Sequence, residues 1–234
     1  MNSSTKTKQK QLDKVISLYQ NKQLLQAKKS AEKLFLSDKQ NLTLLMLLGA
    51  ISQGLGEKEK EKEYLLTLVE LNVQASAVYN DLGNIYSDES EYVLAKKMFK
   101  HSLELDKNYY FAYNGLGLVY FRENDAISAI KMYEKSLEIR NDFDKTYNNL
   151  GNAYKVINNF QKAKEMYLTC LELKPNNISA YSNLAKLYKD EEMFDMARDT
   201  YEKAISIDKD NPEVAFDYGL LCLSSYDYLK GFNL

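Results

Sequence analysis

The segment YNNLGNAYKVINNFQKAKEMYLTCLELKPNN, from Tyr147 to Asn177, carries the pattern that decides the fold. In its first half, Tyr147, Leu150, Gly151 and Tyr154 follow the spacing i, i+3, i+4, i+7 of one helical face. The small residue on that face lets a second helix approach closely, and the tyrosines fill the space between neighbouring helix pairs. The segment therefore predicts a hairpin of two closely packed helices.

The same features recur along the chain with a period of 34 residues. A glycine or alanine stands at the eighth position of the period, at Gly49, Gly83, Gly117, Gly151, Ala185 and Gly219. Twelve residues later comes a small residue, at Ala95, Ala129, Ala163 and Ala197. Sixteen residues after the eighth position comes an aromatic residue, at Phe99, Tyr133, Tyr167 and Tyr201. Several residue types in phase over many periods indicate a repeat architecture.

The L-G-x-x-Y motif, followed by a small and then an aromatic residue, resembles the tetratricopeptide repeat (TPR). The match is strong from Ser76 to Asn211 and weaker from Lys8 to Ala75. The resemblance implies an all-α fold, a right-handed TPR superhelix in which antiparallel helix pairs form an α-solenoid. One hairpin cannot bury its apolar face alone, so stacking in series makes the core. We expect thirteen or fourteen helices and no strand.

The period divides the chain into four parts. Residues 1–7 are expected to be disordered, 8–75 to form two degenerate repeats, 76–211 four well-formed repeats, and 212–234 an incomplete, truncated final repeat. The repeats begin at Lys8, Leu42, Ser76, Tyr110, Asp144, Ile178 and Pro212. In the second repeat, the charge run EKEKEKE from Glu57 to Glu63 places Glu61 where alanine is usual. Such a run predicts a solvated face, with a local kink or a charged docking edge as alternatives.

Composition narrows the classes of function. The 234 residues carry a net charge of −2, which argues against a nucleic-acid partner. The polar N-terminus does not resemble a signal peptide, and the most apolar stretch, Leu42 to Ile51, is too short for membrane insertion. Cys170 and Cys222 do not make a disulfide framework. These features favour a cytoplasmic protein.

No residue set predicts catalysis, a metal site or a cofactor. His101 lacks partners at ligand spacing, and the two cysteines replace core residues. Gly115-Leu-Gly117 falls inside a helix without a preceding strand, so it does not make a dinucleotide site. We therefore expect a protein that is not an enzyme and has no cofactor.

The resemblance also implies a binding surface, because the first helix of each repeat in TPR proteins lines the concave groove, mainly through positions 2, 5, 6, 9, 12 and 13. Asparagine is frequent at these positions, at Asn80, Asn84, Asn114, Asn148, Asn149, Asn152 and Asn183. Its amide both donates and accepts, so a ladder of amides is suited to holding the backbone of an extended peptide. The alternative is that asparagine merely hydrates the groove.

Two local features interrupt the polar ladder. Phe111, Leu118 and Phe121 are expected to form an exposed apolar patch beside Arg122, of the kind that marks partner sites. Three lysines further along the groove favour an acidic segment, at Lys155, Lys186 and Lys189.

These observations favour a non-catalytic scaffold that holds an extended segment of a partner protein in its groove. The alternative is the N-terminal substrate-recognition module of a glycosyltransferase whose catalytic domain is absent here. The asparagines resemble the repeat region of O-linked N-acetylglucosamine transferases, and the end, DYGLLCLSSYDYLKGFNL, resembles the last repeat of bacterial repeat-containing glycosyltransferases. A third possibility is a self-assembling scaffold. We expect self-association through the uncapped end, at Phe216, Leu220, Leu223 and Tyr228.

Overall fold

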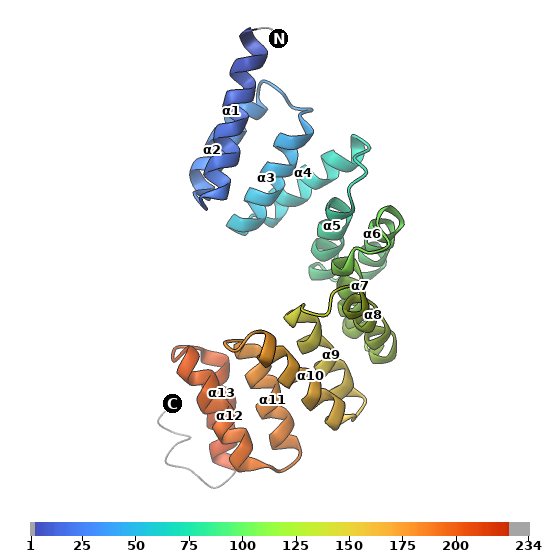
Figure 1. Ribbon diagram of the computed structural model, residues 1–234, viewed down its shortest axis with the longest axis vertical. Helices are drawn as coiled ribbons and strands as arrows, with labels where there is room; N and C mark the ends of the chain where they lie inside the picture. Colours follow the sequence, from blue (N-terminus) through green and yellow to red (C-terminus); the bar gives the residue numbers. More distant parts are fainter. Residues whose placement is uncertain (1–2, 225–234) are drawn as a thin grey trace. The chain divides into compact units, whose positions relative to one another are not determined.

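The structure is a computed structural model that describes residues 3–224 (Figure 1). These residues form thirteen α-helices and no strand, which confirms the all-α expectation. The helices are α1 (Ser3–Gln20), α2 (Leu24–Phe35), α3 (Leu42–Leu55), α4 (Lys58–Glu70), α5 (Ser76–Asp88), α6 (Tyr92–Leu105), α7 (Tyr110–Arg122), α8 (Ala126–Ile139), α9 (Asp144–Val156), α10 (Phe160–Leu173), α11 (Ile178–Asp190), α12 (Phe194–Ile207) and α13 (Pro212–Ser224).

The helices keep the phase of the sequence repeat. Each first helix from α3 onward begins at the residue where the 34-residue period places a repeat start. The first repeat differs, because α1 begins at Ser3 and residues 3–7, which were expected to be disordered, belong to this helix. Within the segment expected as an incomplete repeat, α13 covers Pro212–Ser224, and Tyr228 lies outside the described residues.

The chain divides into two compact units, Met1–Gly115 and Leu116–Leu234, with the boundary inside α7. In the first unit, α1 packs on α2, α3 on α4 and α5 on α6, and α1 also contacts α3. In the second unit, α9 packs on α10 and α11 on α12, while α11 contacts both α9 and α13. First helices of neighbouring repeats are therefore adjacent at α1 and α3 in the first unit, and at α9, α11 and α13 in the second.

A left-handed residue follows the first helix of each of the first six repeats. It stands at the fifteenth repeat position, with φ between 57° and 72°, at Lys22, Gly56, Ser90, Asn124, Asn158 and Glu192. The residue that follows donates its N–H back to the helix, as Asn159 does to the Tyr154 carbonyl at 2.9 Å and Met193 to the Tyr188 carbonyl at 2.8 Å. This is the Schellman arrangement, which satisfies the last carbonyls of a helix and reverses the chain within two or three residues.

In the repeats that begin with α5, α7 and α9, the aromatic residue of the second helix packs directly on a glycine of the first. A Cβ added at Gly151 would lie 2.5 Å from Tyr167 Cε1, and one added at Gly83 would lie 2.7 Å from Phe99 Cε1. Both aromatic rings are fully buried. The glycines are therefore required by the close approach of a ring, which confirms the packing role that the period predicts.

Candidate functional site

Three amides of the second unit are held by hydrogen bonds to side chains of neighbouring helices. Asn183 on α11 donates its Nδ2 to Asn148 Oδ1 on α9 at 3.0 Å. Asn152 Oδ1 accepts a bond of 2.7 Å from the hydroxyl of Tyr167 on α10. An asparagine has two donor hydrogens and an acceptor oxygen, so Asn148 and Asn152 keep their amide N–H groups for a ligand, and Asn183 keeps its oxygen.

Two of the three lysines predicted for the groove, Lys155 and Lys186, are paired with carboxylates of the next first helix. Lys155 Nζ lies 2.8 Å from Asp190, and Lys186 Nζ lies 2.8 Å from Asp217 and 3.5 Å from Glu213. The pKa of Lys186 is raised, because the bonds and charges of these two carboxylates outweigh the lowering effect of burial. An acidic ligand would have to compete with these carboxylates at Lys155 and Lys186. Lys189 is partly buried and has no ion pair among the described residues.

The apolar residues predicted on α7 differ from one another in exposure. Phe111 is 39% exposed, and its ring centroid lies 4.1 Å from that of Tyr110. Leu118 and Phe121 are only partly exposed, and Phe121 packs against the hydrophobic core of the second unit. Phe121 is therefore less exposed than the expected apolar patch requires, since its ring also covers core residues. Arg122 is exposed at the end of the helix.

The asparagines of the first unit also differ. Asn80 is 5% exposed and donates its Nδ2 to Asp81 Oδ1 at 3.1 Å, so it lies below the groove surface. Its own Oδ1 is buried without a hydrogen-bond partner among the described residues. Asn84 is exposed on the same helix, Asn114 on α7 is partly buried, and Asn149 in the second unit is partly buried too.

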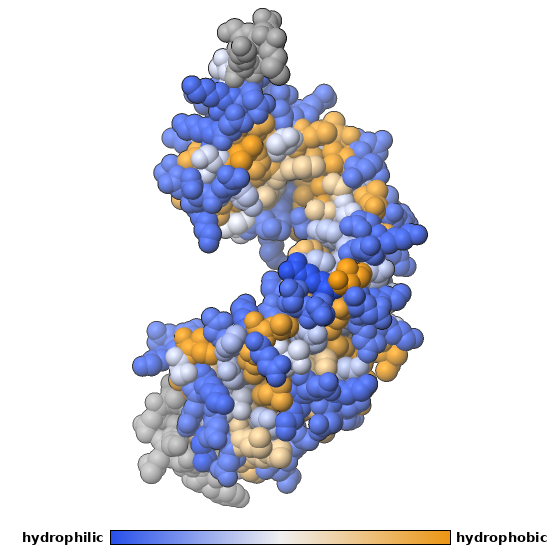
Figure 2. Space-filling model, viewed as in Figure 1, coloured by the Kyte–Doolittle hydropathy of each residue, from blue (hydrophilic) through white to orange (hydrophobic). Residues whose placement is uncertain are grey.

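Sequence reasoning missed a cavity between α3, α4 and α5. It has a volume of about 230 Å³ and is bordered by Gly49, Leu65 and Asp81. Glu61 also lines it and is only 5% exposed, which corrects the expectation of a wholly solvated Glu57–Glu63 run. In Figure 2, apolar side chains show at the surface over the region of α3 and α4, bordered by polar ones. The absence of the usual alanine and aromatic residue from this repeat was the signal that could have revealed the cavity.

Burial alters the acidity of both carboxylates at this cavity. Burial raises the pKa of Glu61, opposed by the hydrogen bond from Gln53 and reinforced by the charge of Asp81. Burial also raises the pKa of Asp81, opposed by the hydrogen bond from Asn80.

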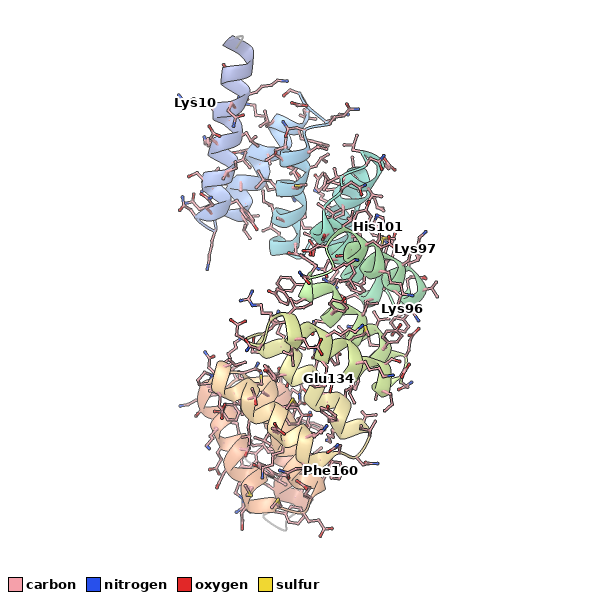
Figure 3. All side chains as sticks on the ribbon, turned by 45° about the vertical axis from the view of Figure 1, so that its right-hand side comes forward. Lys10, Lys96, Lys97, His101, Glu134 and Phe160 are labelled. Atoms are coloured by element: carbon pink, nitrogen blue, oxygen red, sulfur yellow. The ribbon has the colours of Figure 1, made fainter. Side chains whose placement is uncertain are left out.

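The histidine and the two cysteines considered above for catalysis or metal binding are packed against other side chains. The ring of His101 on α6, labelled in Figure 3, stands edge-on to Tyr79 with centroids 4.2 Å apart. Its Nδ1 lies 2.9 Å from Glu104. Cys170 and Cys222 are buried and not disulfide-bonded, and burial together with the charge of Asp144 raises the pKa of Cys170 to about 11. The Cys170 thiol is thus protonated at neutral pH and a poor nucleophile.

The described residues offer neither a metal-binding cluster nor a membrane-spanning helix. No group of three or more histidine, cysteine, aspartate or glutamate side chains is placed to hold a metal ion in residues 3–224. Over the same residues, no helix combines the length and apolar character needed to cross a membrane.

Comparison with known proteins agrees with the fold. Structures with similar architecture include a tetratricopeptide repeat protein from Parabacteroides merdae, 16% identical, with a TM-score of 0.78 over 97% of this chain and 90% of that one. The Cut9–Hcn1 complex of the APC/C matches with 18% identity and a TM-score of 0.82, over 90% of this chain and 42% of the other. At these identities the likeness shows the fold alone.

Among curated proteins, the UDP-N-acetylglucosamine–peptide N-acetylglucosaminyltransferase of Caenorhabditis elegans is 29% identical over 91 residues. These are 39% of this chain and 8% of that protein, so the chain spans a small fraction of this relative.

Family models of the tetratricopeptide repeat match residues 74–142, 144–177 and 178–211. The matched ranges make up more than half of the chain and coincide with the repeats that the helices define. This chain therefore belongs to the tetratricopeptide-repeat family.

Proposed function

We propose that the chain is a non-catalytic binding module whose layer of first helices holds an extended segment of a partner protein. The repeat fold serves protein–protein interaction in this family, and the buried cysteines and the contacts of His101 with Tyr79 and Glu104 argue for structural roles of these residues. Cysteines that form no disulfide also fit work in a reducing, cytoplasmic setting.

The observation that carries the proposal is the Asn148–Asn183 pair between α9 and α11. Each partner fixes the other's orientation, so the free N–H groups of Asn148 and the free oxygen of Asn183 are held in place before a ligand arrives. Preorganised donors and acceptors lose less conformational entropy on binding than mobile ones. A peptide backbone, which alternates N–H and C=O groups, matches such a pair.

A peptide selection tests this proposal. Peptides of random sequence displayed on phage are selected on the wild-type protein, and the affinities of the strongest binders are measured by fluorescence polarisation. The groove variant Asn148→Ala/Lys189→Ala removes one amide and one lysine from the first helices. We expect it to bind about tenfold more weakly, since one neutral hydrogen bond is worth about 0.5–1.5 kcal/mol and the lysine contact adds to it.

The matched control is Gln161→Ala/Lys203→Ala, which likewise removes one side-chain amide and one lysine, from exposed positions on the second helices α10 and α12. It should bind the selected peptides as the wild type does. If the control variant loses binding while the groove variant keeps it, the ligand surface is on the second helices and the proposal is wrong.

The match to the N-acetylglucosaminyltransferase favours a second candidate, in which the groove presents protein substrates to a sugar-transferase domain. The coding sequence that follows Leu234 decides between the two. A sugar-transferase domain in the same reading frame would support the second candidate, and a stop codon would support the first.

A further inference from the structure

Two neighbouring repeats of the first unit differ in the residue that fills the space between their first helices. In the repeat of α5 and α6, the ring of Phe99 is a wedge between two first helices. A Cβ added at Gly83 on α5 would lie 2.7 Å from this ring, and one added at Gly115 on α7 would lie 2.4 Å from it. The ring therefore occupies the whole space between the two helices.

One repeat earlier, the positions of Phe99, Gly83 and Gly115 are held by Leu65, Gly49 and Asp81. The leucine is too short to replace the ring, and a Cβ added at Gly49 would meet only Leu65 Cδ2, at 3.8 Å. The space that a phenyl ring fills in the next repeat is the cavity of about 230 Å³ described above. Met46 and Leu68 complete its apolar walls.

The two charged residues that line this cavity, Glu61 and Asp81, are both acidic, and the amide of Gln53 lines it beside them. Glu61 receives one hydrogen bond, from Gln53 Nε2 at 2.9 Å to its Oε1. Asp81 receives one, from Asn80 to its Oδ1. Among the described residues, neither second oxygen has a donor, and neither carboxylate belongs to an ion pair. Lys58, one turn before Glu61 on α4, is bound to Asp88 at 2.8 Å.

Glu61 is buried, Asp81 is partly buried, and neither forms an ion pair among the described residues. Carboxylates in such surroundings are costly to keep charged, so the cavity favours a ligand that brings positive charge. We propose that the cavity binds an arginine side chain of the partner segment. This inference rests on the proposed function, because it assigns one side chain of the ligand that the groove holds.

Arginine fits the shape and the charge together. Its guanidinium is flat, like the ring that occupies the equivalent space in the next repeat, and its five donors suit two carboxylates on different helices. Its methylene stem suits the walls made by Met46 and Leu65. Lysine would bring one compact charge that cannot bridge Glu61 and Asp81 in the same way. Two carboxylates are also too few ligands for a calcium site.

A titration with single amino-acid derivatives tests the site without any partner. The protein is labelled with 13C at its methionine methyl groups, and N-acetyl-arginine N-methylamide is added while NMR spectra are recorded. We expect the Met46 methyl signal to shift with saturation and those of Met193 and Met196, in the second unit, to stay in place. The citrulline derivative has the same shape without the charge and should give no shift.

Variants then assign the recognition to named groups. Glu61→Gln and Asp81→Asn should each weaken the arginine derivative at least about tenfold, as expected for a lost charged hydrogen bond. Leu65→Phe restores the ring of the other repeats and should abolish binding. The control Glu63→Gln, an exposed residue of the same helix, should bind like the wild type.

Three outcomes would overturn the inference: equal shifts from the citrulline derivative, tighter binding of the lysine or phenylalanine derivative, or full binding by both carboxylate variants. Because the titration uses neither peptides nor second-unit variants, its failure leaves the groove proposal standing. Conversely, if the arginine derivative binds in this cavity but the peptide selection fails, only the groove proposal is contradicted.

Discussion

At the scale of single residues, two equivalent tyrosines differ in how their buried hydroxyls are satisfied. The Tyr167 hydroxyl donates to Asn152, which stands at the ninth position of its repeat. The Tyr133 hydroxyl is buried and has no hydrogen-bond partner among the described residues. The ninth position of its repeat is Leu118, which offers no acceptor. One hydroxyl therefore stabilises the fold and the other costs free energy.

We predict opposite effects from the same substitution at these two sites. Tyr133→Phe should raise the free energy of unfolding by about 1 kcal/mol, because it removes an unpaired buried group. Tyr167→Phe should lower it by about 1 kcal/mol, because it breaks a hydrogen bond. Urea denaturation followed by circular dichroism measures both. Equal effects of the two substitutions would contradict the hydrogen-bond assignment.

Glu61 should make stability depend on pH. Because its pKa is raised in the folded protein, the folded state holds the proton more tightly than the unfolded chain. Stability is thus lost as pH rises from the usual value of 4.5 through the raised one. We predict that Glu61→Gln melts at a higher temperature than the wild type at neutral pH, and that the difference shrinks below pH 4.5. Glu63→Gln, which changes an exposed residue, should show no such trend.

The sequence alone could not have given these residue-level results. Glu61 lies inside an alternating charge run, and such runs usually face solvent. Its burial depends on Leu65 being shorter than an aromatic ring and on Asp81 from the next repeat, so it follows from three helices together. In the same way, Asn148, Asn152 and Asn183 are recognisable as groove residues from their spacing, but their mutual bonds depend on how neighbouring helices stack.

At the scale of elements, each turn between the two helices of a repeat requires the left-handed backbone at one residue. The period that predicts where first helices begin also places this residue, because both follow from the geometry of the hairpin. Residue type is less constrained: Gly56 and Asn124 suit the conformation, whereas Glu192 at φ 60° does not.

We predict that Glu192→Gly stabilises the protein by about 0.5–1 kcal/mol, since the left-handed strain of about 1–2 kcal/mol is relieved and glycine's extra chain entropy offsets part of it. Gly56→Ala provides the reverse test. A Cβ there would meet no atom within 4 Å, so any effect comes from the backbone alone, and we expect destabilisation by about 1 kcal/mol. Thermal denaturation measures both effects. If the melting temperatures of the two variants moved in the same direction, strain of the left-handed backbone would not explain them.

At the scale of the whole molecule, exposed apolar residues on α13 bear on self-association. Phe216 is 66% exposed and Leu220 42%. They occupy the fifth and ninth repeat positions, so their exposure follows from lying on the groove face of a first helix. We predict weak, concentration-dependent association that Phe216→Ser reduces. Sedimentation equilibrium would measure it, with Leu168→Ser, an exposed leucine on α10, as the control. A strict monomer at high concentration would contradict the prediction.

The order of helix contacts has a consequence for synthesis in the cell. Within each unit, the helix–helix contacts between described residues join the same repeat or adjacent repeats. A repeat of 34 residues leaves the ribosome in roughly 2–7 s, whereas a helical hairpin forms in microseconds. Each hairpin can therefore form and dock on its predecessor long before the next one is translated. The apolar face of each new hairpin is then exposed for seconds at most before the next hairpin covers it. This limits how long a chaperone would have to shield that face.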